Sequence, residues 1–179
     1  MGSNECHNGR SVMRKSNNMK KPKFSLAHRD ESIVELVSKT DHKILALWSI
    51  DCVERVLPYF EEKYPGDNRP RKAIEACREW VHTGIFKMKD VRTISLAAHA
   101  AAREVGEDNA ARSAARAAGH AMATAHVATH SIGAANYALQ AIYRAANPSD
   151  TDAAIARERD WQYHHLLELV KTYENEDRT

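Results

Sequence analysis

The chain has 179 residues, a formal net charge of +2 and 43% hydrophobic residues. Its 26 basic and 24 acidic residues nearly balance, whereas dedicated nucleic-acid-binding proteins normally carry a strong basic excess. With only 7 glycines and 5 prolines to separate short strands, the composition also argues against an all-β sandwich or barrel.

The first part of the chain predicts a polar tail followed by two helices. Residues 1–25 are rich in Asn, Ser and Lys and poor in large apolar residues, which predicts disorder. A short helix is expected over 30–39. Asp41 or Thr40 then caps a helix over 42–57, whose apolar residues cover almost the whole circumference. Because such a helix is normally buried, we expect it at the centre of the fold.

This central helix has one narrow polar strip. Asp51 and Arg55 lie on the strip, four residues apart, and can form an ion pair there. Pro58 follows the helix, and it fits either a kink or the first turn of a new helix.

Two amphipathic helices are expected in the middle of the chain. Pro70 suits the first turn of a helix over 71–82, which has one apolar face and which Gly84 ends. A second helix is expected over 89–105, and Gly106 stops it.

The stretch 108–146 contains no proline and would span roughly 55 Å as one helix, at about 1.5 Å per residue. Since that is too long for a compact domain of this size, we expect a break within 125–131 or at Gly133. Pro148 ends the run, and a last helix is expected over 151–173.

Alanine contributes 28 of the hydrophobic residues, and it favours helix while burying little area. Roughly 49 larger apolar residues remain, enough for one core but not for two. The sequence therefore predicts an all-α fold of six to eight helices in one compact orthogonal or antiparallel bundle over 26–174. Residues 1–25 would be a disordered tail, and 175–179 a polar C-terminal end.

The sequence also predicts a compartment. No run of 18 apolar residues is present, so we expect no membrane-spanning segment and no membrane partner. The start of the chain lacks the apolar stretch of a secretory signal. The three cysteines, Cys6, Cys52 and Cys77, show no zinc spacing, and the last two lie in apolar helical patterns. A reduced cytoplasmic protein is the simplest interpretation.

Ten histidines are the one unusual feature of the composition. His126 and His130 are four residues apart, and a metal site could form if His99 and His120 joined them. However, no acidic residue stands at a supporting position, and the expected helix break falls between His126 and His130. We therefore favour packing, capping or solvent exposure for these residues, with a metal-binding helical domain or a metal-dependent enzyme as the alternative.

No sequence motif of a catalytic site is present. Cys52 could pair with His42 or His82 as nucleophile and base only if the fold brought them together. On a buried apolar helix, formation of the Cys52 thiolate is disfavoured. We therefore expect no catalytic residue and no enzymatic activity.

Four residues are candidates for binding a partner protein. Arg69 and Arg71 begin a helix, where they could bind an anion or an acidic partner, although pairing within the chain is favoured, with Asp51, Glu54 or Asp67. Trp161 and His165 lie opposite the apolar stripe of the last helix, and an exposed tryptophan often marks a contact site. Packing of Trp161 between helices is equally compatible with the sequence.

Four segments together resemble a known family: DHKILALWSIDCVERVLPYFEE, DNRPRKAIEACREW, AAHAAARE and ARAAGHAMATAHVATHSIGAANYALQAI. In their order, in their spacing and in the placement of Trp, Arg-Pro-Arg and His, these segments resemble the putative immunity proteins of bacterial polymorphic toxin systems. Those proteins have an immunity-five-like all-helical domain. The resemblance implies a cytoplasmic protein that binds and neutralises a cognate protein toxin, without catalysis or a cofactor. A homo-oligomeric scaffold that associates through its alanine-rich faces is a further alternative.

Overall fold

The computed structural model describes Phe24, residues 31–85 and residues 87–176. These residues form eight α-helices and no strand, as expected. In chain order the helices are α1 (Glu31–Lys39), α2 (His42–Glu54), α3 (Pro58–Glu61), α4 (Arg69–Thr83), α5 (Met88–Glu104), α6 (Ala110–Thr124), α7 (His130–Ala145) and α8 (Thr151–Glu176). The predicted disordered tail, apart from Phe24, lies outside the described residues.

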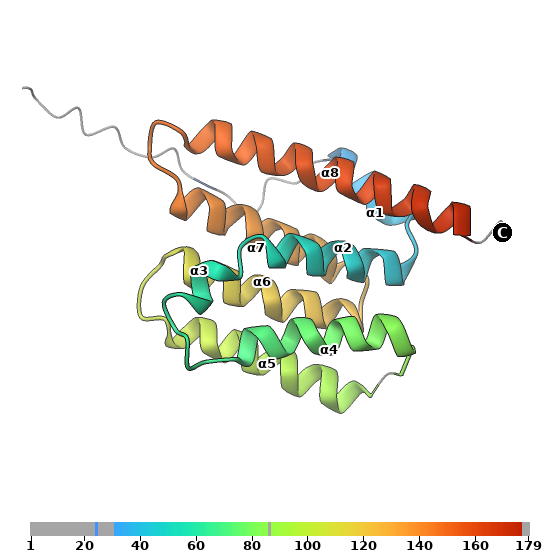
Figure 1. Ribbon diagram of the computed structural model, residues 1–179, viewed down its shortest axis with the longest axis horizontal. Coiled ribbons are helices and arrows are strands. Elements are labelled where there is room, and N and C mark those ends of the chain that lie inside the picture. Colours follow the sequence, from blue (N-terminus) through green and yellow to red (C-terminus); the bar gives the residue numbers. More distant parts are fainter. Residues whose placement is uncertain (1–23, 25–30, 86, 177–179) are drawn as a thin grey trace, which may run out of the picture.

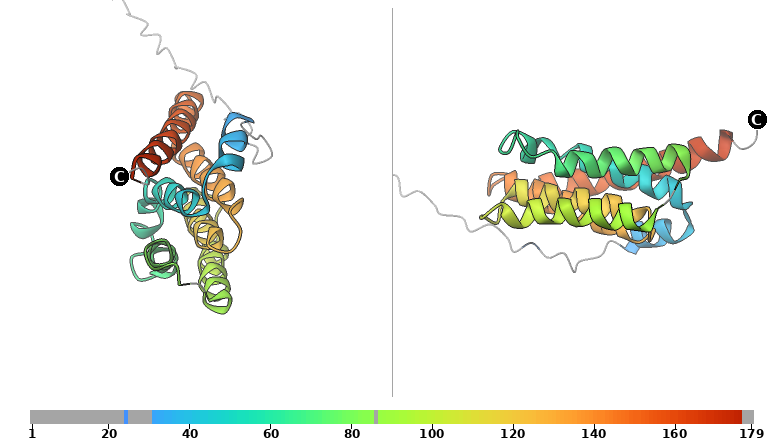
Figure 2. Two further views of the ribbon diagram at one scale, coloured as in Figure 1. Left: turned by 90° about the vertical axis from the view of Figure 1, so that its right-hand side faces the viewer. Right: turned by 90° about the horizontal axis from the view of Figure 1, so that it is seen from below.

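The helices form a compact stack with their axes roughly along one direction (Figure 1). From α4 to α8, consecutive helices run alternately in opposite directions, which gives the antiparallel form of the expected bundle. An end-on view shows that α8 and α5 lie at opposite edges of the stack (Figure 2). None of the described helices is both long and apolar enough to cross a membrane.

Local sequence signals explain where several helices begin and end. The Asp41 carboxylate accepts hydrogen bonds from two backbone amides in the first turn of α2, at 2.8 and 3.4 Å, and so caps that helix. Pro58 begins α3, so the chain starts a new helix there. Gly84 ends α4 in the left-handed conformation, with φ at 68°. The expected break falls between Thr124 and His130.

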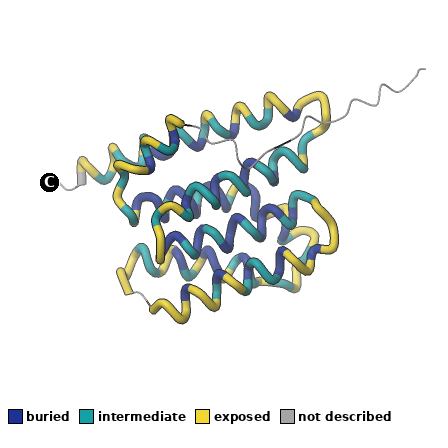
Figure 3. The backbone as a smooth tube through the Cα atoms, turned by 180° about the vertical axis from the view of Figure 1, so that it is seen from behind, coloured by how far each residue is buried: buried dark blue, intermediate teal, exposed yellow. Residues whose placement is uncertain are grey.

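Two helices share the centre of the fold. The expected central helix, α2, is largely buried, and its Trp48 is fully enclosed and donates an indole hydrogen bond of 2.8 Å to the Gln162 carbonyl oxygen. The alanine-rich α6 packs against α2, α3, α4, α5 and α7, and nearly all of its buried residues are small. Because small side chains let helix axes approach closely, α6 fits between its neighbours, and the exposed residues lie mostly along the outer helices (Figure 3).

Candidate functional site

Three of the four histidines considered as metal ligands are brought together. The ring centroids of His99 on α5 and His120 on α6 are 5.1 Å apart, and those of His120 and His130 on α7 are 5.5 Å apart. His126 is exposed in the turn between α6 and α7. Across the part of the chain that the structure describes, no group of three or more histidine, cysteine or carboxylate side chains could hold a metal ion.

The clustered rings pack directly on glycines of the neighbouring helices. A Cβ atom at Gly119 would lie 2.7 Å from His99 Cε1, and one at Gly133 would lie 2.6 Å from His120 Nδ1. The Nδ1 atoms of both rings are buried and have no hydrogen-bond partner within the described residues. Burial is the main cause that lowers the pKa of all three clustered histidines, and it lowers the pKa of His120 to about 4. The His120 ring is therefore neutral near pH 7 and fills space between helices.

Substituting Gly133 by alanine is expected to lower the free energy of unfolding by about 1 to 2 kcal/mol, because the new methyl group collides with His120. In a helix, the same substitution normally stabilises by about 1 kcal/mol. In a His120→Ala background, where the obstacle is gone, Gly133→Ala is therefore expected to be stabilising. Urea unfolding of the four proteins measures this reversal of sign. A stabilising effect in both backgrounds would contradict the close contact.

The cysteines lie in surroundings that do not favour a nucleophile. Cys52 and Cys77 are buried free thiols. Burial raises the pKa of Cys52 well above its usual range and that of Cys77 to about 12. His42, considered as a base for Cys52, packs its ring against Trp80 with a centroid distance of 5.1 Å. Both thiols are therefore protonated at neutral pH and pack as small apolar groups.

Arg69 and Arg71 form ion pairs within the chain. Their partners are Asp67 and Glu104 for Arg69, and Glu54 and Glu61 for Arg71. The Arg71 guanidinium lies 2.8 Å from Glu54 and 2.7 Å from Glu61, so it connects the start of α4 to α2 and α3. These contacts fix the ends of several helices and engage both guanidinium groups.

Trp161 and His165 belong to a column of side chains between α2 and α8. The Arg55 guanidinium carbon lies 3.9 Å from the centroid of the Trp161 ring, and His165 stacks on that ring at 4.7 Å. Arg55 also binds Glu158 with two parallel contacts of 3.2 and 2.9 Å, and His165 Nε2 lies 2.8 Å from Asp51 Oδ2. Asp51 and Arg55 thus pair with α8 rather than with each other, and Trp161 is half-buried.

Exposed apolar side chains gather around the first half of α5. Five large hydrophobic residues are exposed within the described chain. Ile85 lies just before α5, Met88 begins it and Leu96 lies at its middle, while Val127 follows His126, which lines the groove between α5 and α6. The Ile85 residue is 70% exposed and Leu96 is 50% exposed. The fifth, Tyr59, lies on α3 at the other end of the stack (Figure 1). We call the four residues and the grooves beside them the α5 surface.

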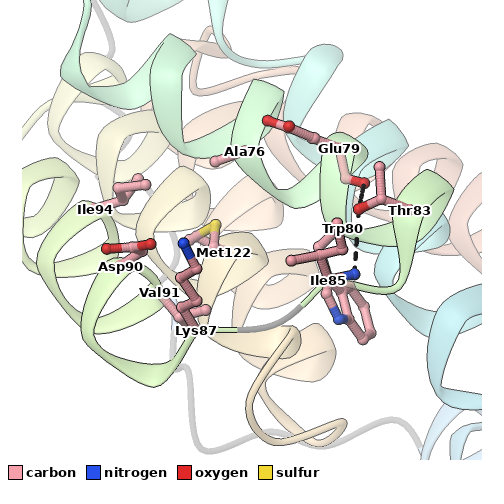
Figure 4. Close-up of a pocket in the computed structure, with 10 residues that line it drawn as sticks. All are labelled: Ala76, Glu79, Trp80, Thr83, Ile85, Lys87, Asp90, Val91, Ile94 and Met122. Carbon is pink, nitrogen blue, oxygen red and sulfur yellow. Dashed lines mark hydrogen bonds between the residues drawn. The ribbon is translucent and has the colours of Figure 1, made fainter.

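Two grooves flank α5 on this surface. The first, of about 280 Å³, lies between α4 and α5, with Trp80 and Ile85 on one side and Val91 and Ile94 on the other (Figure 4). The second, of about 290 Å³, lies between α5 and α6 and is lined by Met88, Leu96 and Val91, among others. The polar residues beside them are Glu79, Lys87 and Asp90 at the first groove and Arg92 and His126 at the second. Apolar grooves with a polar rim are typical of protein-binding surfaces.

Reasoning from the sequence did not find the α5 surface. A signal was present, because Leu96 lies outside the stripe that Val91, Ile94 and Ala98 form on the amphipathic helix. The structure buries Val91 and Ala98 and leaves Leu96 exposed. A large apolar residue outside the buried stripe is therefore the feature that points to this surface.

Comparison with known proteins identifies a family match. A family model described as "Imm-5 like putative immunity protein" matches residues 35–169, which include the whole of α2 to α7 and the α5 surface. No curated protein and no solved structure matches the chain.

Proposed function

Because the chain belongs to the Imm-5 like putative immunity protein family, we propose that it is a non-enzymatic protein that binds a cognate bacterial toxin and neutralises it. The toxin is a protein, and inhibition follows from occupying its surface. No cofactor takes part.

The observation that carries the proposal is the α5 surface. A stable interface buries about 800 Å² on each partner and draws most of its energy from a few apolar anchors that fill pockets. Leu96 and Met88 provide such anchors, and both line the groove between α5 and α6. The opposite edge of the stack, at α8, offers Trp161 as a second candidate, but there the indole is half-buried under Arg55.

The same proposal places the protein in the cytoplasm. Cys52 and Cys77 are free and buried, which suits a reducing compartment. The near-balance of 26 basic and 24 acidic residues favours a protein partner over nucleic acid.

The test uses the protein encoded beside this chain as the toxin. Replacing Met88 and Leu96 together by serine is expected to weaken binding by at least about tenfold, because both apolar anchors are lost. The midpoint of thermal unfolding should stay within about 2 °C, since both side chains are largely solvated in the free protein. Isothermal titration calorimetry gives the affinity, and co-expression gives the protection of growing cells.

The matched control is Tyr59→Ser, which removes an exposed apolar side chain at the far end of the stack and should leave binding unchanged. If Trp161→Ala abolishes binding while the serine variant retains it, the contact surface is on α8 instead. If the purified wild-type protein neither binds nor inhibits the toxin, the proposed function is wrong.

Two alternatives give different results in the same preparation. A metal-binding domain built on the histidines predicts a stoichiometric transition metal after purification without a tag, and the loss of this metal in His126→Ala. A homo-oligomeric scaffold predicts self-association in light scattering and no effect of the protein on toxin activity.

A further inference from the structure

The face that continues from the α5 surface is basic and contains no acidic side chain from α6 or α7. One side of α5 carries four residues at intervals of three or four positions: Arg92, Leu96, His99 and Arg103. The chain has no Asp or Glu between Asp108 and Asp150, a range that includes the whole of α6 and α7. We call the following residues the basic face: His99, Arg103, Arg116, His120 and His130.

The two arginines of the basic face have no acidic partner. Neither Arg103 nor Arg116 has a carboxylate oxygen within 4.0 Å among the described residues, whereas Arg69 and Arg71 are each held by two carboxylates. Asp108, which follows α5, pairs with Arg144, 2.5 Å away, at the end of α7 far from the α5 surface. The two guanidinium groups of the basic face therefore form no ion pair within the described chain, and the neighbouring carboxylate of Glu104 is held by Arg69.

The positive charges of Arg103 and Arg116 act on the neighbouring histidines of the basic face. Both arginines contribute to the lowered pKa of His99, and Arg116 also contributes to that of His120. From α7, the groups that face the cluster are His130 and Tyr137, and neither is a carboxylate. The cluster thus combines basic and aromatic side chains without an ion-paired carboxylate in the described chain.

We infer that the basic face docks an acidic segment of the protein partner, whose carboxylates lie over Arg103 and Arg116 while its apolar residues enter the groove beside Leu96. This inference rests on the proposed function for the identity of the partner. The combination of charge with an exposed apolar groove favours a protein over nucleic acid, since the whole chain carries a net charge of only +2.

The probe is poly-L-glutamate, titrated into the isotope-labelled full-length chain and followed by amide chemical shifts. Shifts are expected around His99–Arg103 and Arg116–His120. Raising the salt concentration from about 0.05 to about 0.5 M should weaken binding at least about fivefold through screening.

Substituting Arg103 and Arg116 together by glutamine should reduce the affinity for poly-L-glutamate at least about fivefold, with thermal unfolding little changed. The matched control is Arg157→Gln with Arg159→Gln on α8, at the opposite edge, which removes the same charge and should change the affinity less than about twofold.

The inference is overturned if poly-L-glutamate causes no shifts at the basic face, or if the two double variants weaken binding equally. It is also overturned if duplex DNA binds the same residues more tightly than poly-L-glutamate. Loss of toxin binding with poly-L-glutamate binding retained would contradict the proposed function alone. If the affinity for the toxin changes neither with the salt concentration nor in the Arg103/Arg116 variant, the inference alone is contradicted.

Discussion

Replacing Arg55 by methionine is expected to lower the free energy of unfolding by about 3 kcal/mol. The side chain of its partner Glu158 is only 4% exposed, and the guanidinium is its one cationic contact in the described chain. Without Arg55, a carboxylate remains buried without a cation. The expected loss lies at the lower end of the range for broken buried ion pairs, because the Arg55 side chain is 41% exposed and water replaces part of it.

A double-mutant cycle separates the ion pair from the packing of Arg55 on Trp161. Combining Arg55→Met with Glu158→Gln removes both charges, and it should recover about 2 kcal/mol relative to Arg55→Met alone. The control is Lys39→Met, which breaks the solvent-exposed pair with Glu35 and should leave the free energy of unfolding nearly unchanged. Urea unfolding is measured for Arg55→Met, Glu158→Gln, the double variant and Lys39→Met. An Arg55→Met variant that loses less than about 1 kcal/mol would show that Glu158 does not depend on this cation.

Acidification from about pH 7 to about pH 5 is expected to cost about 2 kcal/mol of folding stability through His120 alone. In the unfolded chain this imidazole takes up a proton near its ordinary pKa of 6.5, whereas burial lowers the pKa in the folded protein to about 4. Between these values the unfolded state binds more protons, so stability falls as the pH falls. His99 and His130 act in the same direction, because burial lowers the pKa of each.

This pH window separates the histidines from the acidic groups. Ion pairing with arginine lowers the pKa of Asp67 and Glu61, so their contribution to stability is lost only at more acidic pH. Urea unfolding at a series of pH values should show a shallower slope for His120→Gln than for the wild type. The imidazole of His120 should titrate near pH 4 in a chemical-shift titration. A midpoint near 6.5 for that ring would contradict its burial.

Much of the fold follows from local signals that one segment contains by itself. The side chain of Asp41 caps its own helix, Gly84 adopts its own left-handed conformation, and the apolar circumference of α2 already requires burial. The position of α6 at the centre could not be predicted in this way. An alanine helix has the same pattern whether it lies at the centre or at an edge, and its place depends on which neighbours it meets.

The candidate site was harder to predict, because it depends on contacts between distant residues. Arg55 pairs with Glu158, which lies 103 residues later in the sequence, and not with the nearby Asp51. His99 and His120 form one cluster only because Gly119 and Gly133 let three helices approach closely. Trp161 lies opposite the apolar stripe of the last helix, a position compatible with exposure or with packing, and Arg55 covers its ring, while Leu96 remains exposed.

The place of α5 at the edge of the stack has a consequence for how specificity can change. This helix packs mainly on α4 and α6, and its outer residues reach no other part of the core. Under the proposed function, substitutions at Met88, Arg92, Leu96 and Arg103 would therefore change which partner is bound while the remaining helices keep their stability. A library that varies these four positions should yield many folded proteins with different binding preferences. His99 should be left unchanged in such a library, because its ring packs on Gly119.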